Sequence, residues 1–111
     1  MEIAPNEYGL TNYHCWSDCG PTLREVLTKN SVSYQETEIP HLVGFAGNAE
    51  LIFYVSPKLG KPVTVLAIPH RYDIDGFAEE YFYFVGMTKE QALQDEQWWL
   101  NLYPKLKALL P

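Results

Sequence analysis

The sequence predicts one α/β domain, residues 1–111, in which short buried strands alternate with amphipathic helices. Its residues are 47% hydrophobic and 14% aromatic, which is enough to form one core. A chain of 111 residues is too short for a second core. Three apolar runs, at residues 51–55, 63–68 and 81–85, are rich in β-branched and aromatic residues, which favours strands. Segments with helical caps and helical periodicity precede and follow these runs.

The first helix is expected at residues 21–29. Pro21 suits the first turn of a helix, where a backbone N–H would have no intrahelical partner. Asn30 marks the expected end. Three apolar residues of this segment share one face: Leu23, Val26 and Leu27.

A short strand is expected next, at residues 32–35, where apolar and polar residues alternate. We expect Pro40 to end it, because proline cannot donate a hydrogen bond to a neighbouring strand. Residues 48–56 are ambiguous. Asn48 is a favourable helix N-cap, yet residues 51–55 have the composition of a strand, and so short an apolar run has no decisive periodicity.

A central strand is expected at residues 63–68, because apolar residues occupy both of its faces. Pro69 is expected to stop this strand. A loop is then expected at residues 69–76, followed by a further strand at residues 80–85.

The last helix is expected to begin at Thr88, because Thr88 and Gln91 have the spacing of a capping box. At about 100° per residue, four residues share its apolar face: Ala92, Trp99, Leu100 and Tyr103. Trp98 points nearly the opposite way. It is either an exposed apolar anchor beside Asp95 and Glu96, or a residue that the C-terminal tail folds back to cover.

The net charge of −6 is concentrated in one stretch. Seven acids and one base lie between Asp73 and Glu96, whereas seven acids balance seven bases elsewhere. Eight scattered basic residues do not form the clusters that bind phosphates, so we expect no nucleic-acid partner. The acidic stretch is either a solvated surface or a docking face for a basic protein, such as a nuclease.

No apolar run approaches the roughly 20 residues that cross a bilayer, and the first residues lack a basic signal-peptide region. We therefore expect a cytoplasmic protein that does not bind membranes.

Both cysteines, Cys15 and Cys19, lie just before the first expected helix. A thiol at a helix N-terminus can have a lowered pKa, because the helix dipole stabilises the thiolate. Cys19 is therefore the candidate nucleophile, with Cys15 as its possible partner.

The order of expected elements resembles the thioredoxin-like fold, and its small glutaredoxin-like members most of all. The resemblance rests on five segments: a first strand at 8–11, a second strand at 30–36, a second helix at 48–51, a proline-led strand at 60–65 and the start of the last helix at 86–90. It implies a mixed four-stranded sheet flanked by helices, with Pro62 as a cis-proline opposite the thiol. It also implies thiol–disulfide exchange or a binding module derived from it, with no cofactor.

The cysteine spacing departs from the Cys-x-x-Cys site of that family. Cys19-Gly20-Pro21-Thr22 has threonine in place of the second cysteine, which leaves Cys15 as the resolving thiol. In such an exchange Cys19 would attack a substrate disulfide, and Cys15 would release the mixed disulfide.

Other interpretations remain open. The Cys-x-x-x-Cys spacing also resembles thioredoxin-like copper-assembly proteins, in which His41 or His70 would complete a copper(I) site. Both cysteines can equally be small buried hydrophobic residues. A cysteine hydrolase using His70 and Asp73 is a remote third.

The alternative fold is an α+β antiparallel meander with two or three helices on one side. The alternative function is a non-catalytic acidic protein-binding module or immunity-type inhibitor. The candidate binding residues are Pro62, Trp98, Asp95 and Glu96.

The thiol hypothesis makes a testable prediction. At mildly acidic pH, Cys19 should be alkylated by iodoacetamide distinctly faster than Cys15, because only Cys19 lies at the expected helix start. Mass spectrometry of the tryptic peptides would give both rates. Equal and slow alkylation of the two thiols would remove the redox hypothesis.

Overall fold

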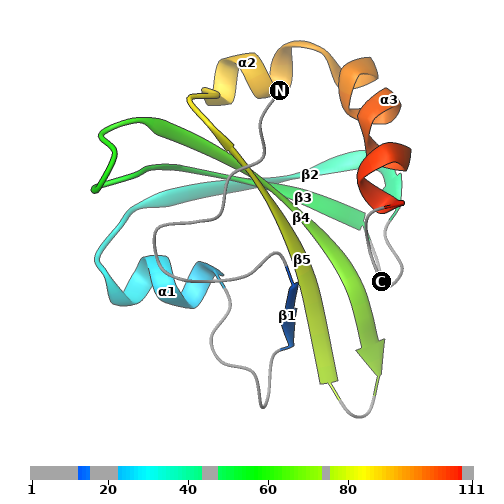
Figure 1. The fold of residues 1–111 in the computed structure, drawn as a ribbon, viewed down its shortest axis with the longest axis horizontal. Coiled ribbons are helices and arrows are strands. Elements are labelled where there is room, and N and C mark those ends of the chain that lie inside the picture. Colours follow the sequence, from blue (N-terminus) through cyan, green and yellow to red (C-terminus); the bar gives the residue numbers. More distant parts are fainter. Residues whose placement is uncertain (1–12, 16–22, 44–47, 74–75, 109–111) are drawn as a thin grey trace.

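A computed structural model describes residues 13–15, 23–43, 48–73 and 76–108 (Figure 1). The elements follow in this order: β1 (Tyr13–Cys15), α1 (Leu23–Lys29), β2 (Tyr34–Val43), β3 (Asn48–Val55), β4 (Pro62–Asp73), β5 (Gly76–Val85), α2 (Lys89–Gln94) and α3 (Glu96–Lys107).

The strands form one sheet in the order β1-β5-β4-β3-β2. The four longer strands, β2 to β5, make an antiparallel meander, and β1 adds to its β5 edge. The predicted combination of strands and helices is confirmed. The predicted mixed sheet is wrong for the described strands, since every pairing among them is antiparallel.

The ambiguous segment is strand β3, in which Leu51 lies opposite Leu66 of β4. The helix that the thioredoxin resemblance implies at residues 48–51 is therefore wrong. The cis-proline is also wrong, because the peptide bond before Pro62 is trans. Four consecutive buried side chains at residues 51–54 explain the strand, since a sheet covered on both faces buries successive residues.

Two prolines that were expected to end strands lie inside them. Pro40 lies in β2, which is an edge strand, and an edge tolerates a missing N–H. Pro69 lies in β4, beyond the last β3–β4 pair and next to a register shift between Pro69 and Arg71. The predicted loop at residues 69–76 is consequently mostly strand, because β4 and β5 remain paired as far as Asp73 and Gly76.

Side chains alternate across the sheet and build a core on each face. One core combines β-strand residues with α2 and α3: Ile39, Ala49, Leu51, Phe53, Leu66, Ile68, Phe82, Phe84, Ala92, Trp99, Tyr103 and Leu106. The other combines them with α1: Leu23, Leu27, Ile52, Tyr54, Val63, Val65, Ala67, Tyr81 and Tyr83. The alternative fold, an antiparallel meander with two or three helices on one side, is therefore closer to the structure: β2 to β5 form the meander, α2 and α3 cover one face, and α1 covers the other.

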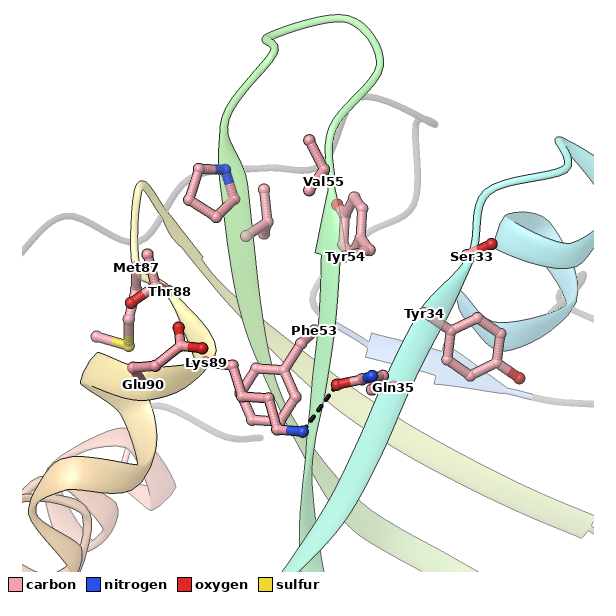
Figure 2. A pocket seen from close by; sticks show the side chains of 12 residues that line it. Ser33, Tyr34, Gln35, Phe53, Tyr54, Val55, Met87, Thr88, Lys89 and Glu90 are labelled. Atoms are coloured by element: carbon pink, nitrogen blue, oxygen red, sulfur yellow. Dashed lines mark hydrogen bonds between the residues drawn. The ribbon is translucent and has the colours of Figure 1, made fainter.

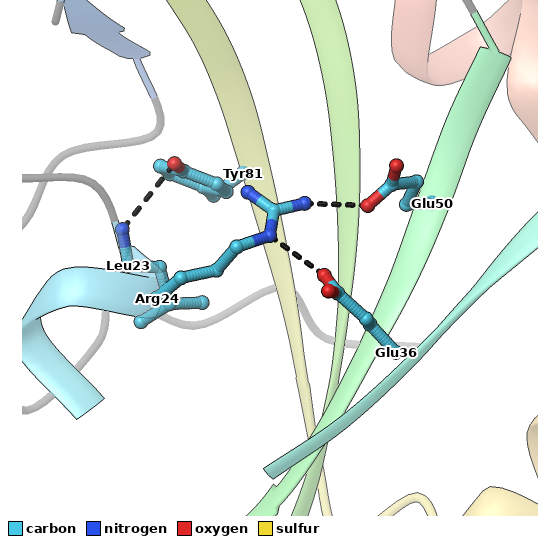
Figure 3. A network of polar contacts seen from close by, with 5 residues as sticks. All are labelled: Leu23, Arg24, Glu36, Glu50 and Tyr81. Atoms are coloured by element: carbon cyan, nitrogen blue, oxygen red, sulfur yellow. Dashed lines mark hydrogen bonds and ion pairs between the residues drawn. The ribbon is translucent and has the colours of Figure 1, made fainter. Parts of the chain in front are cut away.

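Polar contacts fix α1 to its face of the sheet (Figure 3). The Arg24 guanidinium donates to Glu36 on β2 at 2.7 Å and to Glu50 on β3 at 2.6 Å. Glu50 lies opposite Glu38, so Arg24 compensates a cross-strand pair of like charges. The backbone N–H of Leu23 donates to the buried Tyr81 hydroxyl at 3.3 Å.

The expected last helix is two helices separated at Asp95. The predicted capping box is confirmed: Thr88 Oγ1 accepts from the Gln91 N–H, and the Gln91 side chain accepts from the Thr88 N–H. Asp95 has extended backbone angles, ends α2 and caps α3. Pro104 lies within α3, which continues to Lys107. No helix in the described part of the chain is long and apolar enough to span a membrane.

Trp99 joins the two helices. Its indole is 1% exposed, and its Nε1–H donates to the Ala92 carbonyl of α2 at 2.6 Å. Tyr103 lies one turn further along α3 and is also buried. Burial raises the pKa of the Tyr103 hydroxyl above its ordinary value of 10.0, because the phenolate is poorly solvated there.

We predict that Trp99→Phe lowers the free energy of unfolding by about 1–3 kcal/mol, because the buried Ala92 carbonyl loses its donor. Trp98→Phe should cost less than Trp99→Phe, because Trp98 is only partly buried. Urea denaturation followed by circular dichroism gives both values. Equal losses would contradict the assigned role of Trp99.

We predict that the free energy of unfolding falls at alkaline pH because of Tyr103. Its folded-state pKa lies above the unfolded value, so its stabilising contribution is complete below about pH 10 and declines as the pH rises through the folded value. Tyr103→Phe should therefore be less sensitive to pH in that range. The measurement is the urea midpoint of both proteins from about pH 8 to about pH 11. A difference between them that does not vary with pH would refute this.

Candidate functional site

The two candidate catalytic cysteines are only partly placed. Cys15 lies in β1, with its Cα opposite Ala78 of β5. Cys19 lies outside the described residues, so thiol–disulfide exchange stays a prediction. Among the residues that the structure describes, no three histidine, cysteine or acidic residues are grouped to hold a metal.

Cys15 and Pro62 are not neighbours, whereas the position of Pro62 relative to the candidate nucleophile Cys19 lies outside the described residues. Cys15 pairs at Ala78, near one end of β5, whereas the Pro62 end of β4 pairs at Val85, near the other. Ala78 and Val85 are seven residues apart along β5, which corresponds to about 24 Å of strand. Cys15 and Pro62 are therefore too far apart to belong to one site.

Pro62 instead lines a groove of about 460 Å³ between the sheet and the start of α2, which we call the Pro62 groove (Figure 2). Its apolar lining includes Phe53, Val55 and Met87. Val55 is 60% exposed, so the apolar face of β3 continues into solvent here. Lys89 reaches from α2 over Phe53, with its Nζ 6.0 Å from the ring centroid.

Lys89 is held in this position by β2. Its Nζ donates to Gln35 Oε1 at 2.7 Å, as Figure 2 shows. The aliphatic part of the lysine side chain thus shields Phe53, which is 7% exposed, while the ammonium group remains at the surface.

A second hollow, also of about 460 Å³, lies at the junction of α2 and α3, and we call it the Trp98 hollow. It is lined by Met87, Gln91, Gln94, Asp95 and Trp98. Two of the predicted binding residues, Asp95 and Trp98, are therefore brought together. The break in the helix causes this, because Asp95 Oδ1 accepts from the Trp98 backbone N–H at 3.3 Å and caps α3.

The Trp98 ring is partly buried and packed between aromatic neighbours. It meets Phe84 at 6.2 Å between ring centroids and Trp99 at 4.6 Å, both in edge-to-face geometry. Such contacts restrain the ring without enclosing it. Trp98 is intermediate between the exposed anchor and the covered residue that were expected: it packs against one core and also lines the hollow, and residues 109–111 of the tail lie outside the described residues.

Glu96 does not belong to the Trp98 hollow. It lines a smaller hollow of about 160 Å³ between β2 and the helices, with Ile39 and Trp99. Residues two positions apart on a helix project about 200° apart, which directs Glu96 and Trp98 to different sides of α3.

Met87 is the site residue that sequence reasoning missed. It lines both the Pro62 groove and the Trp98 hollow, so the two meet at this residue, and we call them together the Met87 surface. The backbone of this turn is fixed, because the Gly86 N–H donates to the Pro62 carbonyl at 2.7 Å and the Thr64 hydroxyl to the Met87 carbonyl at 3.0 Å. Gly86 has a φ of 90°, a backbone conformation that favours glycine. A glycine at this place in the sequence indicates a tight turn, and Met87 is the residue that follows it.

Comparison with protein-family models, with curated proteins and with solved structures finds no match for this chain.

Proposed function

We propose that the chain is a non-catalytic protein-binding module that recognises a basic partner through the Met87 surface. The observation that carries the proposal is the position of Trp98, a large aromatic residue that is restrained by Phe84 and Trp99 and faces an open hollow. Tryptophan contributes disproportionately to binding energy at protein interfaces. A ring that is already immobilised loses little conformational entropy on binding.

The composition of the surface supports a protein partner. Met87 is a flexible, polarisable side chain that adapts to differently shaped ligands. Val55 and Pro62 extend the apolar area along the groove, and polar residues surround it. A central apolar region with a polar rim is the usual arrangement of a protein interface.

The charge of the chain supports a basic partner. The net charge is −6, and the Met87 surface is lined by the acids Glu90 and Asp95 and by one base, Lys89, which donates to Gln35. A field of this sign accelerates association with a cationic protein and repels an anionic one. Thiol exchange is the less supported proposal, because the described residues include only one of its two cysteines, Cys15.

The proposal is tested by selecting ligands from a random peptide library displayed on phage, with the purified chain immobilised. Trp98→Ala should weaken binding of the selected peptides by about 2 kcal/mol or more, because an interface loses its central aromatic residue. Met87→Ala should weaken it as well. Isothermal titration calorimetry with synthetic peptides gives the affinities, and circular dichroism confirms that each variant is folded.

Leu93→Ala is the matched control. Leu93 is an apolar residue of α2 that is 50% exposed, but it lines the smaller hollow beside Glu96 and not the Met87 surface. Its truncation should leave the affinity nearly unchanged. Peptides whose affinity depends on Leu93 and not on Trp98 or Met87 would refute the proposal.

A further inference from the structure

We propose that the Trp98 hollow receives an arginine side chain of the partner, with the guanidinium against the Trp98 ring and paired with the Asp95 carboxylate. This inference rests on the proposed function and specifies the chemistry that one part of the Met87 surface recognises.

The lining of the hollow is suited to a cationic group that also has an apolar body. Met87 and Trp98 provide the apolar contact, whereas Gln91, Gln94 and Asp95 carry oxygen acceptors. None of the five is basic. An anionic ligand would face Asp95, and a purely aliphatic one would remove water from three polar side chains without replacing its hydrogen bonds.

Asp95 retains capacity for a partner. Its Oδ1 accepts from the Trp98 backbone N–H, but a carboxylate can accept about four hydrogen bonds. No ion pair of Asp95 is found among the described residues. The nearest lysine of α2, Lys89, is directed toward Gln35 of β2.

The adjacent turn of α2 presents no opposing charge. Gln91 and Gln94, in the last turn of α2, line the hollow, and that turn contains no basic residue. A cation in the hollow would therefore lie beside Asp95 and meet no like charge from α2.

Arginine fits this combination better than lysine. A guanidinium is planar, so it can stack on an indole while its edge donates two parallel hydrogen bonds to a carboxylate. The ammonium group of lysine is more strongly hydrated and makes no such bidentate pair. We therefore expect arginine to be preferred to lysine, and both to a neutral analogue of the same shape.

The test uses short peptides of alternating glycine and arginine, and matched peptides in which lysine or citrulline replaces arginine. Citrulline keeps the planar shape of arginine without its charge. Binding is followed at constant ionic strength by nuclear magnetic resonance of the tryptophan indole N–H signals, which Trp98→Phe and Trp99→Phe assign. The arginine peptide should shift the Trp98 signal saturably, the lysine peptide should bind more weakly, and the citrulline peptide should leave the signal unmoved.

Asp95→Asn isolates the charge, because asparagine caps a helix as well as aspartate does. This substitution should weaken the affinity for the arginine peptide about ten-fold or more, because a charge-assisted pair is lost. Glu96→Gln is the matched control: it removes one acid at the adjacent position, outside the Trp98 hollow, and should change the affinity less than about three-fold.

Three results would overturn the inference: equal binding of the citrulline peptide, equal effects of Asp95→Asn and Glu96→Gln, or no shift of the Trp98 signal with any peptide. If the peptides selected from the library still depend on Trp98 but not on Asp95, the proposed function stands and the hollow receives an apolar group. If no selected peptide depends on Trp98 or Met87, the proposed function fails as well.

Discussion

Burial of both faces of one antiparallel sheet is the constraint on which the rest of this structure depends. β3, β4 and β5 carry large apolar residues at successive positions, so neither face can be left to water. Only short helices are available to cover them. α3 has 12 residues and spans about 18 Å, whereas the 12 residues of β4 span about 40 Å. Helices of this length leave parts of each face open, and the Pro62 groove is one such part.

The separation of α2 and α3 into two helices follows from the same need to cover the sheet. A straight helix of their combined length could follow only one direction across the face. Asp95 interrupts it with an extended backbone and caps the second helix, so that both segments contribute to one core. The break leaves a concave junction, and that junction is the Trp98 hollow. The hollow is thus a consequence of how the core is covered.

The elements that the sequence predicts best are those with a local physical cause. The capping box at Thr88 and the end of the first helix at Lys29 depend on neighbouring residues alone, and both are found. The strand at residues 48–55 could not be distinguished from a helix, because its identity depends on pairing with β2 and β4.

Pro40 and Pro69 were misjudged for a related reason. Proline excludes a strand only where its nitrogen would face a neighbouring strand. Whether it does so depends on which strand is at the edge of the sheet and where the register shifts.

The dependence on distant pairing also limits what the sequence predicts about the site. Asp95 and Trp98 are close in sequence, and their proximity could be predicted. Met87 joins the Pro62 groove to the Trp98 hollow only because its turn is bonded to β4. A pairing of turn and strand that are more than 20 residues apart has no signature in the local pattern of residues.

Two adjacent tryptophans show how scaffold and binding surface are separated in this molecule. Trp99 is fully enclosed and donates its indole N–H to α2, so it holds the two helices together. Trp98 packs edge-to-face against that fixed ring and against Phe84, and so takes its position from the core. Because neighbouring residues on a helix diverge by about 100°, the core that immobilises one tryptophan leaves part of the other in solvent. A surface aromatic held this way is pre-organised by folding itself. The Trp98 hollow is therefore a better candidate for recognition than the more exposed Leu59 or Leu93, which lie on a turn and on a short helix.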